Sequence, residues 1–221
     1  MVNSHPFSHF PPEPDEDHAR EKSFRIINKD NAAFFKNDAA FDWMYPEHLQ
    51  LLSLKQWTRL AVARKAARFL ARPGARVLDI GSGIGKFCLA AAHLYPGTNF
   101  FGVEQRGELV HFAEEAGKYL QLSNVHFTQA NITQINFREF DHFYFYNSFY
   151  ENLDPDSCID DTIATSSSLY FYYTLYLLQA FDDLPAGTRL VTFHTLGEEI
   201  PSSYRLVKTS WDMLLKMWIK Q

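Results

Sequence analysis

The sequence has few cysteines, no long apolar run and no surplus of basic residues. Its two cysteines, Cys88 and Cys158, lack the spacing of a metal or redox motif, which excludes a disulfide framework or a cysteine-based zinc site. No stretch approaches the roughly 20 apolar residues of a membrane span. The first residues carry Pro, His and acidic residues where a secretory signal has a basic and then an apolar run. We therefore expect a cytoplasmic protein with no membrane partner.

Charge and histidine usage exclude two further classes of site. The formal net charge is -5, which argues against a protein that holds nucleic acid through phosphate contacts alone, although a local basic face is compatible with it. The nine histidines include no H-E-x-x-H pair and no Cys/His cluster. The sequence therefore predicts no bound metal.

The length favours one folded unit. With 221 residues, 46% of them hydrophobic, the chain buries one full-sized core. Residues 1–20 have little apolar periodicity and are predicted to form a mobile tail. Residues 21–221 are predicted to form a single domain that begins with a helical cover, 21–72, because the aromatic residues there are too many for a linker.

Within this cover the sequence predicts a helix from Ser53, as its cap, to about Ala71. Apolar residues recur on one face of that segment. The opposite face is basic, and it is either solvated or turned toward an acidic partner. Its cations are Arg64, Lys65, Arg68 and Arg72.

A glycine-rich stretch follows the cover and organises the rest of the chain. Residues 77–80 form a short apolar run suited to a buried parallel strand, and Gly81, Gly83 and Gly85 then allow a sharp turn beside a ligand. Helical spacing resumes at Phe87. A dinucleotide fingerprint needs its third glycine at position 86, where this chain has Lys86. The alternative to a ligand site is a tight turn alone.

The pattern Asp79-x-Gly81-x-Gly83-x-Gly85 resembles motif I of the class I S-adenosylmethionine (SAM) methyltransferases. The resemblance implies SAM as the cofactor. It also implies that Asp79 and the backbone of the turn, with Ser82, hold its methionine part. Thr58, in the predicted helix, falls near where related enzymes bring a segment over the methionine carboxylate.

A second predicted strand, 99–103, ends at Glu104, roughly 20 residues beyond the glycine turn. A carboxylate at that tip accepts the ribose hydroxyls of an adenosine, so we assign Glu104 and its neighbour Gln105 to the cofactor site; the alternative is an ordinary surface Glu. After a third strand, 125–128, the resemblance places Asn131 and Ile132 at the adenine. The family usually has Asp there, and an Asn in such a loop also serves simply to form a turn.

A fourth strand, 141–146, delivers Asn147, Phe149 and Tyr150 to the edge of the sheet where ligands gather. We assign Asn147 to orienting the methyl acceptor and the two aromatic residues to walling it. The segment resembles the Asn-Asn-Phe of histone lysine methyltransferases that lack a SET domain more than the Asn/Asp-Pro-Pro-aromatic motif of enzymes acting on base amines. The acidic loop that follows, 151–161, either attracts a cationic amine or favours the next helix N-terminus.

A fifth strand, 189–194, and a strand pair, 204–208 and 213–219, complete the chain. With these strands, the resemblance implies an α/β fold: a Rossmann-like, mostly parallel seven-stranded sheet with helices on both faces and an antiparallel C-terminal strand pair. The predicted function is transfer of a methyl group from SAM to an unidentified acceptor, an amine such as a protein lysine. The alternatives are a small-molecule or RNA acceptor, a noncatalytic SAM-binding protein, or a nicotinamide-dependent reductase.

Overall fold

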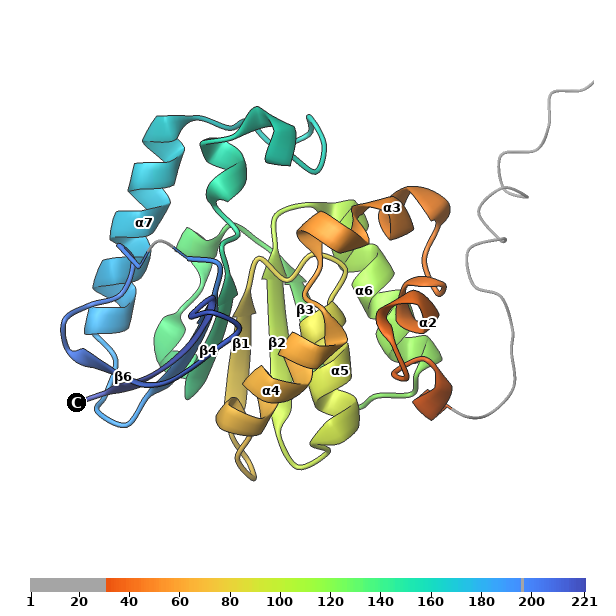
Figure 1. Cartoon of the computed structure of the whole chain (residues 1–221), viewed down its shortest axis with the longest axis horizontal. Coiled ribbons are helices and arrows are strands. Elements are labelled where there is room, and N and C mark those ends of the chain that lie inside the picture. The colour runs from red at the N-terminus through yellow and green to blue at the C-terminus, as the bar shows by residue number, and fades with distance from the viewer. Residues whose placement is uncertain (1–30, 196) are drawn as a thin grey trace, which may run out of the picture.

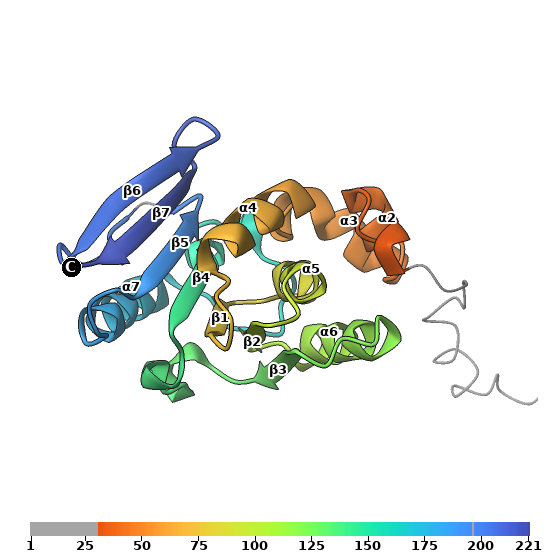
Figure 2. The same cartoon turned by 90° about the horizontal axis from the view of Figure 1, so that it is seen from below.

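The computed structural model describes residues 31–195 and 197–221, which form one sheet with helices on both faces (Figures 1 and 2). The predicted tail, 1–20, and the first ten residues of the predicted cover lie outside the described residues. No helix in the described part of the chain is long and apolar enough to cross a membrane.

Seven strands lie in the order β3-β2-β1-β4-β5-β7-β6. The first five, which the chain enters in the order β1 to β5, are parallel, and β7 runs antiparallel to both β5 and β6. This confirms the predicted mostly parallel sheet with an antiparallel C-terminal pair. The strands are β1 (Arg76–Ile80), β2 (Asn99–Glu104), β3 (Val125–Gln129), β4 (His142–Tyr146), β5 (Arg189–Phe193), β6 (Tyr204–Ser210) and β7 (Leu215–Lys220).

Side chains alternate between the two faces of the sheet, and each face packs against its own helices. Tyr144 of β4 joins the core under α4 (Leu60–Leu70) and α5 (Lys86–Leu94). Its neighbours Phe143 and Phe145 join the core under α7 (Ser167–Asp182) on the other face. Figure 2 shows α4, α5 and α6 (Gly107–Tyr119) together on one side of the sheet and α7 on the opposite side.

The N-terminal segment packs on the α5 side and contains η1 (Asn31–Ala33), α2 (Asp38–Asp42) and α3 (Glu47–Gln56) before α4. The prediction of one helix from Ser53 to Ala71 is wrong, because the chain is extended at Trp57 and at Arg59, and α3 and α4 are separate. No Gly or Pro marks this break. It follows from tertiary contacts: the Trp57 indole is buried and donates to the Leu49 carbonyl, 2.9 Å away, and the Thr58 hydroxyl bonds that of Tyr144.

Ser53 is consequently no helix cap. It lies inside α3, is buried, and its hydroxyl donates to Asp42 of α2. The connections after β3 and after β4 contain four short 3-10 helices: η2 (Ile132–Gln134), η3 (Phe137–Glu139), η4 (Tyr150–Asn152) and η5 (Pro155–Ser157).

Candidate functional site

The glycine turn joins β1 to α5 at the carboxyl edge of the sheet. The backbone N–H groups of Gly81 and Ser82 both donate to the carbonyl of Val103 on β2, and each N···O distance is 2.9 Å. Gly85, which has a left-handed backbone (φ 78°), precedes the first residue of α5. Because glycine has no side chain, this helix begins without a side-chain cap. The free N–H groups and the dipole of this helix therefore face the turn and favour a ligand with negative charge.

Two of the glycines are required by close approaches from other segments. A Cβ on Gly83 would lie 2.6 Å from the Trp57 ring, and a Cβ on Gly81 would collide with the hydroxyl of Ser148. Both glycines also have positive φ, 71° and 52° for Gly81 and Gly83. The turn is thus pressed between the α3–α4 connection and the segment after β4, and side chains from both line the same space.

That space is a cavity of about 360 Å³, within the range of small-ligand sites. Its walls come from the α3–α4 connection, the tips of β1, β2 and β4, and the loop 147–159. The sequence-predicted residues that line it are Thr58, Asp79, Gly81, Ser82, Gly83, Glu104, Gln105, Ile132, Asn147, Phe149 and Tyr150.

Asp79 lies at the tip of β1 and is almost fully buried. Burial raises the pKa of its carboxyl to about 8; the thiol of Cys88, 3.7 Å from Oδ2, lowers the pKa and the nearby charge of Glu104 raises it further. The same burial, with the charge of Asp79, raises the pKa of the Cys88 thiol. A cationic ligand group beside Asp79 would restore the ionised carboxylate.

Glu104, at the tip of β2, accepts three backbone hydrogen bonds. Its Oε1 accepts from the N–H groups of Gln105 and Arg106 at 2.8 and 3.0 Å, and its Oε2 accepts from Gly83 at 3.1 Å. Burial raises the pKa of this carboxyl, and these hydrogen bonds and the charge of Arg106 partly oppose the shift. A carboxylate has about four acceptor positions, so one acceptor position remains free, at Oε2. The prediction required two free positions, one for each ribose hydroxyl.

The hydroxyl of Ser82 is buried against the cavity, and within the described residues it has no hydrogen-bond partner. Buried polar groups are normally paired. An unpaired hydroxyl between the two carboxylate-bearing strand tips is the expected state of a group that a ligand contacts.

Arg106 ties the β2 tip to the loop after β4. Its guanidinium forms a two-pronged ion pair with Glu151, at 3.1 and 2.7 Å, and its Nε donates to Asp160 at 3.0 Å. The arginine is buried and lines the cavity. Burial lowers the pKa of Arg106, but the bonds to Glu151 and Asp160 outweigh this and leave it raised. The loop that carries Asn147 and Tyr150 is therefore fastened over the cavity by charge.

Lys86, the first residue of α5, makes the corresponding link to the N-terminal segment. Its ammonium lies 2.7 Å from Asp42, 2.9 Å from Asp38 and 3.3 Å from the hydroxyl of Ser53. Only 2% of the side chain is exposed. Its three donors are thus already satisfied, and its two carboxylate partners offset a cation at a helix N-terminus, which is otherwise unfavourable.

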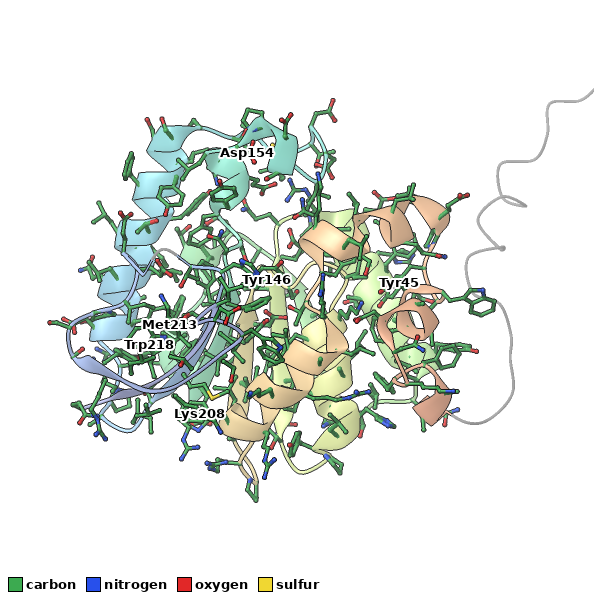
Figure 3. The ribbon with its side chains drawn as sticks, in the orientation of Figure 1. Tyr45, Tyr146, Asp154, Lys208, Met213 and Trp218 are labelled. Carbon is green, nitrogen blue, oxygen red and sulfur yellow. The ribbon has the colours of Figure 1, made fainter. Side chains whose placement is uncertain are left out.

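The residues after β4 form another wall of the cavity. Figure 3 labels Tyr146, the last residue of β4, and Asp154 in the loop beyond it. Asn147 adopts a left-handed backbone (φ 36°), which is uncommon outside glycine and tolerated best by Asn and Asp. Within the described residues its carboxamide forms no hydrogen bond and remains available to a ligand. Tyr150 is 39% exposed, whereas Phe149 is buried against Phe145 and Tyr173 and serves the core as much as the cavity.

Two predicted cofactor residues do not line the cavity. Gly85 faces away from it, because a Cβ there would lie 2.5 Å from the Phe127 ring on β3. Asn131 caps η2: its Oδ1 accepts from the N–H and hydroxyl of Thr133, and its Nδ2 donates to Gln105 and Tyr173. The amide oxygen of Asn131 is thus occupied, and the structure does not support the assigned bond to an adenine amino group. The two neighbouring residues, Ala130 and Ile132, do line the cavity.

The sequence reasoning missed several lining residues. Trp57, Lys86, Arg106, Tyr146 and Ser148 line the cavity in addition. Lys86 and Arg106 directly follow the assigned motifs, and their position beside Gly85 and Glu104 was the available signal. Within the described residues no group of three or more His, Cys, Asp or Glu side chains is placed to hold a metal ion.

Comparison with known proteins found a family model that resembles the central part of the chain. Residues 71–174 match a family model described as a methyltransferase domain. That segment contains the glycine turn, Glu104 and Asn147. This part of the chain is therefore similar to a methyltransferase domain, and the predicted resemblance to class I SAM-dependent methyltransferases is confirmed by that match and by the fold.

A curated relative matches more locally. The chain is 53% identical over 55 residues to the tRNA (guanine-N(7)-)-methyltransferase of Synechococcus sp. strain JA-3-3Ab, which is 25% of this chain and 23% of that protein. The match thus spans about a quarter of the length of the relative.

Two solved structures share the fold. TrmN from Thermus thermophilus has 22% identity and a TM-score of 0.55, covering 76% of this chain and 49% of that one. An RNA methyltransferase from Salinibacter ruber, in complex with S-adenosyl-L-homocysteine, has 20% identity and a TM-score of 0.50, covering 72% of this chain and 90% of that one.

Proposed function

We propose that this chain is a SAM-dependent methyltransferase. The observation that carries the proposal is the pair of buried carboxylates, Asp79 and Glu104, at adjacent strand tips on either side of the glycine turn and around one cavity. Asp79 supplies an acceptor for the ammonium of the methionine part. The α5 N-terminus faces the region of its carboxylate, and the free position on Glu104 accepts a ribose hydroxyl. Ser82, whose hydroxyl has no hydrogen-bond partner among the described residues, lines the same cavity.

SAM supplies an activated methyl group on a sulfonium, and transfer to a nucleophile is an in-line displacement. The protein's contribution is to align the acceptor and to exclude water. Asn147 offers a free carboxamide to a neutral acceptor, and Tyr146, Phe149 and Tyr150 provide apolar walls. The loop held by Arg106 excludes water from this end of the cavity.

Two acceptor classes are compatible with the site. The acidic loop 151–161 favours a cationic amine, but the structure assigns most of its acids to other contacts: Glu151 and Asp160 pair with Arg106, and Asp154 caps η5. The local match to an enzyme named for tRNA guanine methylation favours a nucleic acid base instead. We infer that a base of RNA is the better-supported acceptor and that a protein lysine is the alternative.

Calorimetry with two ligands tests the cofactor assignment. S-adenosylhomocysteine should bind with micromolar affinity, on the order of -8 kcal/mol. NADH should show no binding at the same concentrations, because Lys86 occupies the position of the third dinucleotide glycine. Tighter binding of NADH would overturn the proposal.

Asn147→Ala tests the chemistry separately from cofactor binding. Affinity for S-adenosylhomocysteine should stay nearly unchanged, because the carboxylates and the turn remain. Methyl incorporation from tritiated SAM into extracted RNA or protein should fall about a hundredfold, since an orienting hydrogen bond in a dry site contributes a few kcal/mol to the transition state. Asn136→Ala, at the start of η3, is the matched control. Cofactor binding without any incorporation by the unaltered protein would favour a noncatalytic SAM-binding protein.

A further inference from the structure

Two segments of this acidic protein carry several cations and no acid, and together they form what we call the basic face. The segment 59–72, which contains α4, carries five cations and no Asp or Glu, and the edge strand β6 carries two cations and no acid. The protein as a whole has a formal net charge of -5. The seven residues are Arg59, Arg64, Lys65, Arg68, Arg72, Arg205 and Lys208.

These seven cations have no ionic partner in the part of the chain that the structure describes. Within the described residues none of them forms a salt bridge, and all except the half-buried Lys65 are exposed. The buried cations, in contrast, are paired: Lys86 with two carboxylates and Arg106 with three. A solvated helix face accounts for exposed cations on α4 alone, but not for their continuation onto a strand from the other end of the chain.

An exposed aromatic side chain lies within this basic face. Trp211, in the turn between β6 and β7, is 42% exposed, and the ammonium of Lys65 lies 4.8 Å from the centre of its ring. Trp211, Asp212 and Met213 all have left-handed backbone, with φ of 51°, 50° and 67°. Non-glycine residues adopt this conformation at a cost in free energy, and such strain clusters at functional surfaces. In Figure 2, α4 and the tip of the β6–β7 hairpin project from the same side of the sheet, opposite α7.

The basic face is continuous with the cavity. The carbonyl of Leu214, beside the hairpin tip, accepts from the N–H of His194 at 3.1 Å. The His194 ring packs at 5.8 Å from that of Tyr146, which lines the cavity. Arg59 adjoins Thr58, also on the cavity wall. Figure 3 labels Tyr146, the last residue of β4, and Met213, in the turn between β6 and β7.

We propose that this face, formed by the seven cations and Trp211, binds single-stranded RNA and delivers one of its bases to the cavity. Cations spread along a helix match the repeated charges of a phosphate backbone. The 11 residues of α4 span about 16 Å, enough for several consecutive phosphates, and Arg59 and Arg72 flank the two ends of the helix. An exposed tryptophan is the platform on which an unpaired base stacks. A partner protein with an acidic surface would pair with the cations but would leave the exposed tryptophan without a role. The proposal rests on the proposed methyltransferase function, whose local relative is named for tRNA.

The test is the binding of a fluorescein-labelled single-stranded RNA of about 20 nucleotides, followed by anisotropy over a range of salt concentrations. The triple variant R68Q/R72Q/K208Q should weaken binding at least about tenfold and reduce the slope of log affinity against log salt by about 2, since each phosphate contact contributes roughly 0.7. Trp211→Ala should weaken binding at least about fivefold, and Trp211→Phe should restore part of it.

The matched control K36Q/K118Q/R138Q removes the same charge from other exposed positions and should leave RNA affinity nearly unchanged. Equal weakening by the control, or no effect of Trp211→Ala, would overturn the proposed surface. Binding of a lysine-rich peptide in place of RNA would overturn it in favour of a protein acceptor.

Calorimetry with S-adenosylhomocysteine separates this proposal from the enzymatic one. The triple variant should keep its affinity for this ligand, because none of the three residues lines the cavity. Loss of RNA binding with cofactor binding intact supports the surface. If the unaltered protein does not bind RNA, the proposed RNA surface is wrong, but the methyltransferase proposal stands. If the unaltered protein does not bind S-adenosylhomocysteine, the methyltransferase proposal is wrong.

Discussion

Asp79 and Glu104 are carboxylates at neighbouring strand tips, and they differ in the partners that they hold. Glu104 accepts three backbone N–H groups and so helps to build the turn beside it. Among residues 31–195 and 197–221, the Asp79 carboxyl has only the weak contact with the Cys88 thiol, and burial raises its pKa to about 8. The Glu104 carboxylate therefore has a structural role as well as a ligand-binding one, and the Asp79 carboxylate is left to pair with a cation.

The substitution Glu104→Gln should weaken S-adenosylhomocysteine binding at least about tenfold, because a charged hydrogen bond contributes roughly 1.5 to 3 kcal/mol and an amide NH2 cannot accept one. Gln keeps the size of the side chain, whereas Ala would also remove all three backbone bonds. Calorimetry measures the affinity, and Glu108→Gln, an exposed acid in the first turn of α6, is the control. Unaltered affinity in Glu104→Gln would remove this residue from the ribose site.

Cofactor binding should depend on the ionisation of Asp79. Below pH 8 its carboxyl is mostly protonated, and an ammonium group binds the ionised form. Affinity should therefore rise about tenfold per pH unit from mildly acidic to neutral pH, with release of a proton on binding. Calorimetry in buffers of different ionisation enthalpy measures that proton, and in Asp79→Asn both effects should disappear.

The same pKa has the opposite consequence for stability. The folded pKa is raised above the unfolded value, so between about pH 4 and pH 8 the folded state binds more protons than the unfolded state. This group therefore lowers the free energy of unfolding as pH rises through that window. A binding optimum on the alkaline side, with a stability contribution that is greatest on the acidic side, is the combined signature of Asp79.

At the scale of elements, buried ion pairs hold the segments around the cavity. Lys86 at the start of α5 fixes α2 and α3 through Asp38, Asp42 and Ser53. Arg106 at the start of α6 fixes the loop after β4. Because Trp57 and Thr58 follow α3, the Lys86 cluster also determines where they meet the glycine turn.

The substitution Lys86→Met should lower the free energy of unfolding by about 3 to 5 kcal/mol, because it leaves the buried carboxylate of Asp42 without its cation. The double variant Lys86→Met/Asp42→Leu removes that charge as well and should recover most of the loss. Urea denaturation measures both. Lys118→Met, which breaks an exposed pair with Glu115, is the control and should change little. A double variant no more stable than the single one would contradict this account.

At the scale of the whole molecule, a ligand in the cavity contacts segments from most of the fold at once: the α3–α4 connection and the tips of β1, β2 and β4. Occupancy should therefore stabilise the domain as a unit. At a concentration of S-adenosylhomocysteine a hundredfold above Kd, the gain is about 2.7 kcal/mol, which raises Tm by roughly 5 to 10 °C in a chain of this size. Differential scanning fluorimetry measures the shift, and an equal shift with NADH would contradict a site selective for SAM.

Local spacing predicted the individual strands and the two acidic strand tips, and the family resemblance implied the seven-stranded sheet with its antiparallel edge. The strand after the cover, the glycine turn and the acid about 20 residues later form one βαβ unit, whose geometry is set by short-range rules. Each of the seven strands could be placed because apolar runs or alternation bounded by turns are local patterns. Asp79, Glu104 and Asn147 follow as the residues at the ends of such strands.

The sequence by itself therefore determined the order of the elements and the edge at which the site lies, and tertiary contacts decided how that site is lined and closed. The break between α3 and α4 has no local signal, because burial of Trp57 against Gly83 opposes helix propensity there. Gly85 and Asn131 were assigned to the cofactor, but packing against Phe127 and the capping of η2 engage them elsewhere. The ion pairs of Lys86 and Arg106 join residues 44 and 45 positions apart, a pairing that no local pattern encodes.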